Sequence, residues 1–130
     1  MKQKIEQKLW KLAVKARKTS YAPYSKFRVG AALVSHGKFW AGANVENVSY
    51  GATICAERTA IVHAVVAGLK KPIESICVVT SLGVAPCGMC LQVMAEFCVP
   101  ETVVYIATPK GIQKALKFKH LFPSPFTHFR

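Results

Sequence analysis

The sequence contains no aspartate, and its six acidic residues stand against 18 lysines and arginines, which gives a formal net charge of +12. Such an excess is typical of proteins that bind nucleic acid or an anionic membrane surface. However, nine of the 18 basic residues fall within the first 28 positions, several others follow Lys110, and no arginine-rich cluster or recognition motif lies between them. We therefore interpret the excess as a solvated basic surface and expect neither a nucleic-acid nor a membrane partner.

From its apolar segments we expect neither a secretion signal nor a transmembrane span. The first 18 residues interrupt their apolar positions with lysine, unlike the apolar core of a signal peptide. Residues 75–95 are uncharged, but glycine, proline and polar residues break them up, which suits buried strands and a helix better than a transmembrane span. No repeat, linker or low-complexity segment stands out. We expect a cytoplasmic protein made of one domain, residues 1–130.

Apolar periodicity predicts the secondary structure. Apolar residues at helical spacing, with lysines between them, predict an amphipathic helix over 2–18, which ends before the turn residues around Pro23. The later patterns predict, in order, two strands joined by a turn at 35–38, a helix over 53–68, a strand over 74–81, a helix over 87–97, a strand over 101–108 and a short helix over 111–120. This order indicates an α/β protein, in which helices cover both faces of a mixed sheet with a parallel portion late in the chain.

The five cysteines are an odd number in a chain expected to be cytoplasmic, which favours metal binding or catalysis over a disulfide framework. Cys87 and Cys90 form a Cys-x-x-Cys pair at the start of a predicted helix, so both thiols lie on one face. Alone, this pair fits a zinc site and a thioredoxin-like redox pair equally well. Cys55 favours zinc, because it also begins a predicted helix, and three ligands leave the fourth tetrahedral position open, as in catalytic sites. Cys77 and Cys98 lie in apolar runs and are interpreted as small buried residues.

Glu57 and Arg58 follow Cys55 almost directly. An acidic residue in the first turn of a helix is often only a favourable partner of the helix dipole. Beside an open zinc position, however, the carboxylate of Glu57 can take a proton from a zinc-bound water and return it to the substrate. Three thiolates outweigh the charge of Zn²⁺, so we interpret Arg58 as a residue that tempers thiolate charge through a hydrogen bond to a ligand sulfur.

These residues resemble the cytidine deaminase family, specifically its small homotetrameric branch with three cysteine zinc ligands. The matching segments occur in family order and cover nearly the whole chain: YAPYSKFRVGAAL (21–33), NVENVSYG (44–51), TICAERTA (53–60), PCGMCLQVMAEF (86–97) and LFPSPF (121–126). The resemblance implies a three-layer α/β/α fold with a mixed five-stranded sheet, and one Zn²⁺ per subunit on Cys55, Cys87 and Cys90. It also implies hydrolytic deamination of free cytidine and 2′-deoxycytidine, in pyrimidine salvage, with Glu57 as acid and base.

The same matching implies residues that bind the substrate. Phe27 matches the residue that packs on the base, while Asn44 and Glu46 match residues that hydrogen-bond the ribose. Ala56 matches a small residue that lets the backbone approach the substrate. Two aromatic residues match positions that reach a neighbouring subunit's site, Tyr50 and Phe126. The resemblance therefore implies a homotetramer with composite active sites.

Two positions depart from the family pattern. Leu91 stands where relatives usually have an arginine after the second cysteine of the pair, and Arg28 stands where many relatives have proline. Neither residue is a zinc ligand or the acid and base. We expect activity to persist, with changes confined to subunit contacts and substrate affinity.

Two other functions remain compatible with these motifs. Related enzymes edit RNA or DNA, and the charge of +12 makes that substrate class worth testing, although a 3′-phosphodiester would bring negative charge against Glu46. Alternatively, the cysteines hold a structural zinc in a binding module that turns over no substrate.

Overall fold

The computed structural model describes residues 2–127 of the chain, with side chains from Lys4 onward. Its elements are α1 (Lys2–Arg17), β1 (Gly30–Ser35), β2 (Lys38–Ala43), the 3₁₀ turn η1 (Tyr50–Ala52), α2 (Ala56–Val66), β3 (Ile73–Val79), α3 (Gly88–Phe97), β4 (Cys98–Thr108), β5 (Gly111–Lys117) and α4 (Phe118–Leu121). The strands form a five-stranded sheet in the order β2-β1-β3-β4-β5. β3 and β4 pair in parallel, whereas the other neighbours are antiparallel, which confirms the mixed sheet and its late parallel portion.

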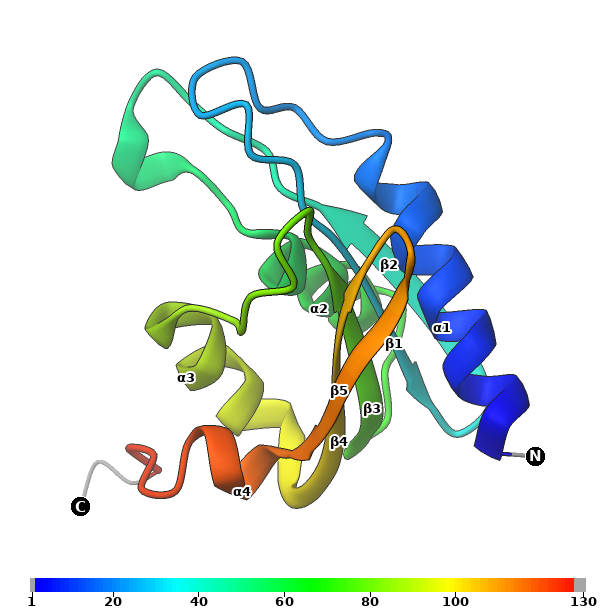
Figure 1. Cartoon of the computed structure of the whole chain (residues 1–130). Helices are drawn as coiled ribbons and strands as arrows, with labels where there is room; N and C mark the ends of the chain where they lie inside the picture. The colour runs from blue at the N-terminus through cyan, green and yellow to red at the C-terminus, as the bar shows by residue number, and fades with distance from the viewer. Residues whose placement is uncertain (1, 128–130) are drawn as a thin grey trace.

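Alternation along the strands gives the sheet two apolar faces. In β1, Leu33 belongs to the buried cluster on one face and Ala32 to the cluster on the other. Leu9 of α1 packs into the cluster that contains Ala32, while Ile61 of α2 and Met94 of α3 pack into the cluster that contains Leu33. Figure 1 shows α1 and α3 on opposite sides of the sheet. The three-layer α/β/α arrangement expected from the sequence is therefore confirmed.

The sequence-based prediction of a helix over 111–120 is wrong. Residues 111–117 form β5, which pairs antiparallel with β4, and only the four residues of α4 that follow are helical. Gln, Lys, Ala and Leu have good helix propensity, but pairing with β4 satisfies the backbone and lets Ile112 and Leu116 pack against the two apolar clusters. Tertiary contacts thus override local propensity in this segment.

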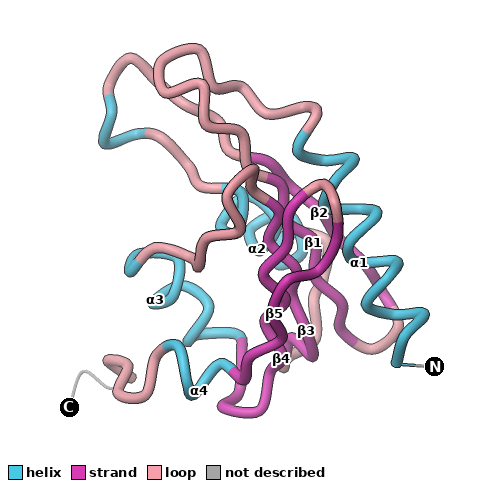
Figure 2. The backbone as a smooth tube through the Cα atoms, in the orientation of Figure 1, coloured by secondary structure: helices cyan, strands magenta, loops and turns pink. Residues whose placement is uncertain are grey.

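Helix α2 begins at Ala56, three residues later than predicted, because Ile54 is extended. The backbone of Ile54 exchanges two hydrogen bonds of 2.9 Å with the backbone of Val45. This isolated bridge joins the loop after β2 to the residue just before Cys55. Figure 2 shows the long loops that precede β1 and α2 lying together beyond the end of the sheet. The bridge therefore fixes these loops relative to the start of α2.

Gly42 in β2 positions the same helix against the sheet. A Cβ atom at Gly42 would lie 2.5 Å from Ala60 N and 2.9 Å from Thr59 C, both backbone atoms of α2. Only a residue without a side chain allows this close approach.

Within residues 2–127, no helix is long and apolar enough to span a bilayer.

Candidate active site

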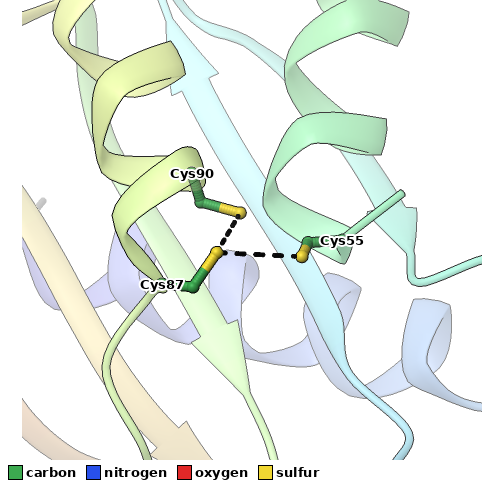
Figure 3. Close-up of side chains that lie close together, drawn as sticks. All are labelled: Cys55, Cys87 and Cys90. Atoms are coloured by element: carbon green, nitrogen blue, oxygen red, sulfur yellow. Dashed lines mark hydrogen bonds between the residues drawn. The ribbon is translucent and has the colours of Figure 1, made fainter. Parts of the chain in front are cut away.

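Two helix N-termini bring three thiols together. Cys55 is the N-cap residue of α2, Cys87 is the N-cap residue of α3, and Cys90 lies in the first turn of α3. The sulfur of Cys87 lies 3.9 Å from that of Cys55 and 3.5 Å from that of Cys90, and all three lie within 4.8 Å of one another. Figure 3 shows the three side chains converging between the two helices.

The spacing of these sulfurs fits a zinc ion. Zinc–sulfur bonds of about 2.3 Å in a tetrahedron place neighbouring sulfurs about 3.8 Å apart, close to the separations observed. Three soft thiolate donors favour zinc over hard cations such as Mg²⁺ or Ca²⁺. With no fourth ligand from His, Cys, Asp or Glu in this group within the described residues, one coordination position remains for a water or substrate atom. The site therefore has the composition of a catalytic zinc site.

Charge in this cluster is shared unequally between the thiols. The thiol of Cys90 and the guanidinium of Arg58 lower the pKa of Cys55 to about 5, although burial opposes the shift. Arg58 Nη2 donates to the Cys55 sulfur at 3.4 Å, as the sequence predicted for this side chain. The neighbouring Cys55, with burial and the Glu57 carboxylate, in turn raises the pKa of Cys90. Three adjacent thiols can therefore all ionise only when a cation offsets their charge.

Glu57 lies in the first turn of α2 and is buried, with 5% of its surface exposed. Burial raises the pKa of its carboxyl group to about 7, and the negative charge of Cys55 acts in the same direction. A carboxyl group with a pKa near neutrality can both accept and donate a proton under physiological conditions. This pKa is compatible with the proton transfer predicted for Glu57, and that role stays a prediction.

A cavity of about 310 Å³ connects these residues with the loops. Its lining residues are Ser25, Phe27, Val29, Asn44, Glu46, Thr53, Cys55, Glu57, Val84, Ala85 and Cys87. Phe27, Asn44 and Glu46, predicted as substrate contacts, therefore share one cavity with Glu57 and two of the three thiols. Ala56 is fully buried between Cys55 and Glu57.

Within the described chain, Tyr50 and Phe126 do not line the cavity that holds the thiols, although Tyr50 lines an adjoining pocket with Ser25, Glu46 and Thr53. Both side chains are largely exposed, at 75% and 61%. Tyr50 belongs to η1, and its ring packs edge-on against Tyr24. Phe126 follows α4, and its carbonyl oxygen accepts a hydrogen bond of 2.9 Å from Gln92 in α3. A single copy of the chain does not bring either aromatic ring to the thiols.

Sequence reasoning missed several polar residues around the cavity. Ser25 contacts Glu46, Ser20 contacts Asn44, and Thr53 lines the cavity wall. Ser25 lies inside the segment YAPYSKF that carried the family resemblance, but a serine in a turn gives no separate signal. Val84 and Ala85 come from the loop after β3, and nothing in their residue types indicated a site.

The fold and this cavity first define a class of protein. An α/β/α fold that clusters three cysteines at two helix N-termini, two of them lining one cavity with a buried glutamate, is the arrangement of a zinc-dependent deaminase. A family model described as the cytidine and deoxycytidylate deaminase zinc-binding region matches residues 3–106. The chain therefore belongs to the cytidine and deoxycytidylate deaminase family.

Individual relatives agree with this assignment. A cytidine deaminase from Halalkalibacterium halodurans is 46% identical over 124 residues, which cover 93% of each chain. Another, from Sporosarcina psychrophila, is 44% identical and covers 87% of this chain and 85% of the relative. The crystal structure of cytidine deaminase from Burkholderia pseudomallei superposes with a TM-score of 0.87 at 43% identity, covering 92% of this chain and 98% of that one.

Proposed function

We propose that the chain is a zinc-dependent cytidine deaminase, which converts free cytidine or 2′-deoxycytidine and water into uridine or 2′-deoxyuridine and ammonia in pyrimidine salvage. The observation that carries this proposal is the shared cavity, in which the buried Glu57 lies beside two of the three clustered thiols. The names of the similar proteins support the substrate, since those from H. halodurans, S. psychrophila and B. pseudomallei are cytidine deaminases.

In the proposed mechanism Cys55, Cys87 and Cys90 would hold the zinc, which when bound would supply a Lewis acid that makes water nucleophilic near neutral pH. Glu57 moves both protons of the attacking water: it passes the first to N3 of the cytosine ring and the second to the departing amine, which leaves as ammonia while C4 becomes a carbonyl. The pKa of Glu57, raised to about 7 by burial, suits both directions of transfer.

Other residues hold the substrate and the thiolates. Phe27 packs on the base, Asn44 and Glu46 bind the ribose, and the small Ala56 lets the backbone approach the substrate. Arg58, which donates to the Cys55 sulfur, tempers the thiolate charge. Because deamination would be the same reaction on any cytosine, these contacts decide which cytosine derivative is accepted.

The substrate is a free nucleoside rather than a polynucleotide. Glu46 lines the cavity, and hydrogen bonds from Ser25 lower the pKa of its carboxyl group, so the group is negative at neutral pH. A 3′-phosphodiester would meet this charge with a charge of the same sign.

We further propose that the chain is one domain, that it works in the cytoplasm, and that it assembles into a homotetramer in which Tyr50 and Phe126 reach a neighbouring copy's cavity. Support for assembly comes from the large apolar side chains that one copy exposes, among them Val48 at 77%, Val66 at 89% and Leu82 at 74%. Light scattering coupled to size-exclusion chromatography should give four times the chain mass. A monomer with full activity would contradict the composite site.

The experiment that tests the function is a deamination assay on protein whose zinc content has been measured. We expect one zinc per chain, loss of cytidine and 2′-deoxycytidine absorbance with release of ammonia, and little activity on a short cytosine-containing oligonucleotide. Protein with one zinc per chain and no turnover of cytidine would indicate a structural zinc module. Comparable rates on the oligonucleotide would indicate a polynucleotide deaminase.

A further inference from the structure

The carboxylate of Glu46 is held by three donors from one turn. Its Oε1 accepts the backbone N–H groups of Tyr24 at 3.0 Å and Ser25 at 3.1 Å. Its Oε2 accepts the hydroxyl group of Ser25. An ionised carboxylate offers about four acceptor positions, so about one remains for a ligand, on Oε2.

The amide of Asn44 is held in the same manner. Its Oδ1 accepts the hydroxyl group of Ser20 and the backbone N–H of Val29, the latter at 2.9 Å. Its Nδ2 donates to the carbonyl oxygen of Phe27 at 2.8 Å. Because both acceptor positions of Oδ1 are occupied, the amide has one orientation, and one N–H of Nδ2 remains for a ligand.

Ser25 also has a fixed direction for its proton. The backbone N–H of Phe27 donates to Ser25 Oγ at 2.9 Å, so the hydroxyl proton is free to point toward Glu46. Lys26, between these two residues, has a φ of +61°, a left-handed conformation that a non-glycine residue adopts only when its surroundings hold it. The hydroxyl group of Ser25 contacts Glu46 and also accepts the N–H of Phe27, and these two contacts close the turn around Lys26. Phe27 is thereby tied at its N–H to Ser25 and at its carbonyl to Asn44.

We propose that Ser25 and Ser20 are positioning residues that hold Glu46 and Asn44 as an acceptor and donor pair for a free sugar hydroxyl group. A hydroxyl group donates one hydrogen bond and accepts others, so it fits the remaining Oε2 position of Glu46 and the remaining N–H of Asn44 together. A phosphate ester at the same oxygen only accepts, and it adds negative charge beside the carboxylate. The inference rests on the proposed function, because it deepens how that site selects its substrate.

The two serines differ in the effect expected from their removal. Ser25 donates to the carboxylate, and hydrogen bonds to charged groups are the stronger class. In Ser20→Ala, Asn44 Oδ1 keeps the donor Val29 N, so the amide keeps its preferred orientation with less restraint. We therefore expect a larger change in substrate selection from Ser25→Ala than from Ser20→Ala.

The test compares cytidine, 2′-deoxycytidine and 3′-deoxycytidine as substrates. In Ser25→Ala we expect the KM for cytidine to rise about tenfold with kcat within about threefold, and the preference for cytidine over 3′-deoxycytidine to fall about tenfold. Ser20→Ala should raise the KM for cytidine and lower the preference for cytidine over 3′-deoxycytidine, each by about threefold. Ser25→Thr, which keeps the hydroxyl group at an exposed position, should restore the preference.

The matched control is Thr19→Ala, which removes a hydroxyl group that donates to Ala16 O at 2.7 Å and lies outside the cavity. Zinc content and melting temperature are measured for every variant. An unchanged preference in Ser25→Ala would overturn the inference, as would loss of kcat and zinc together, which would mean a structural role. If the wild-type protein itself does not deaminate cytidine, the proposed function fails, which is a different result.

Discussion

The two sides of the cavity are built on different principles. The helix side consists of the N-termini of α2 and α3, where Cys55, Glu57 and Cys87 line the cavity and Cys90 completes the thiol cluster. The loop side consists of residues 20–29 and 44–54, drawn as loop for most of their length in Figure 2. Packing holds the helix side, whereas hydrogen bonds of the backbone and of polar side chains hold the loop side.

This difference matches the demands on each side. The metal and the proton carrier need positions fixed to fractions of an ångström, and fully buried residues such as Ala60 in α2 and Met94 in α3 provide that rigidity. The loop side has to admit and release a nucleoside, and polar contacts in a loop select a substrate while allowing motion. Chemistry is therefore expected to depend on the helix side and affinity on the loop side.

The largest effect is expected from loss of a thiol on the helix side. Cys90→Ala should reduce zinc well below one per chain and lower turnover of cytidine by at least about 10³-fold, because two sulfurs hold zinc poorly. Cys77→Ala is the matched control, since Cys77 is equally buried but lies in the cluster under α1. That variant should keep its zinc and activity and lose about 1 kcal/mol of unfolding free energy. Metal analysis and thermal unfolding check both, and full activity in Cys90→Ala would exclude the zinc site.

Substitution of the two cavity carboxylates, Glu57 on the helix side and Glu46 on the loop side, compares how each side contributes to kcat and KM. Glu57→Gln should lower kcat by about 10²–10⁴-fold with zinc content unchanged, because the amide cannot carry the proton. Glu46→Gln should mainly raise KM, by about tenfold, because it removes a charged acceptor for the sugar. Steady-state kinetics on cytidine separate the two variants. If Glu46→Gln lowered kcat as much as Glu57→Gln, the division between chemistry and affinity would be wrong.

Alanine substitutions of Gly42 and Gly51 test how tightly the helix side and the loop side are packed. In Gly42→Ala the new Cβ would meet backbone atoms of α2, so the helix must shift and carry Cys55 and Glu57 with it. We expect a loss of about 1–3 kcal/mol in unfolding free energy and a reduced kcat. Gly51, on the loop side, has no atom within 4 Å of an added Cβ, so Gly51→Ala should change stability by less than about 0.5 kcal/mol. Denaturant unfolding gives both values, and equal losses would mean that the loop side is also tightly packed.

The helix side could be predicted from sequence because zinc restricts both the residue type and the spacing. Cys-x-x-Cys at a helix start puts two thiols on one face, and the structure brings Cys55 to them as predicted. The roles assigned to Phe27, Asn44 and Glu46 came from family resemblance alone, because loop contacts depend on long-range folding and leave no periodic pattern. For the same reason Ser20 and Ser25 gave no signal.

The fold was predictable where apolar periodicity and burial agree. α1 followed from the helical spacing of its apolar residues, and the helices on both faces of the sheet and its parallel pair followed from the order of the predicted elements. The segment 111–117 failed because its composition favours a helix, whereas it forms a hairpin with β4 across the turn at 109–110, which the sequence-based prediction missed. The subunit roles of Tyr50 and Phe126 stay predictions, since they depend on contacts between copies.

The smallest effect on activity is expected from thiol modification of the zinc-loaded protein. Burial raises the pKa of Cys77 and of Cys98 to about 12, so at pH 7.5 only about 10⁻⁴ or less of either thiol is ionised and able to react. The three remaining thiols are protected by the metal, and the loop side contains no cysteine. Iodoacetamide should therefore lower activity by less than about twofold. After zinc is chelated, mass spectrometry should find label on Cys55 and Cys87, and label on Cys77 at the same rate would mean that the metal also holds the core closed.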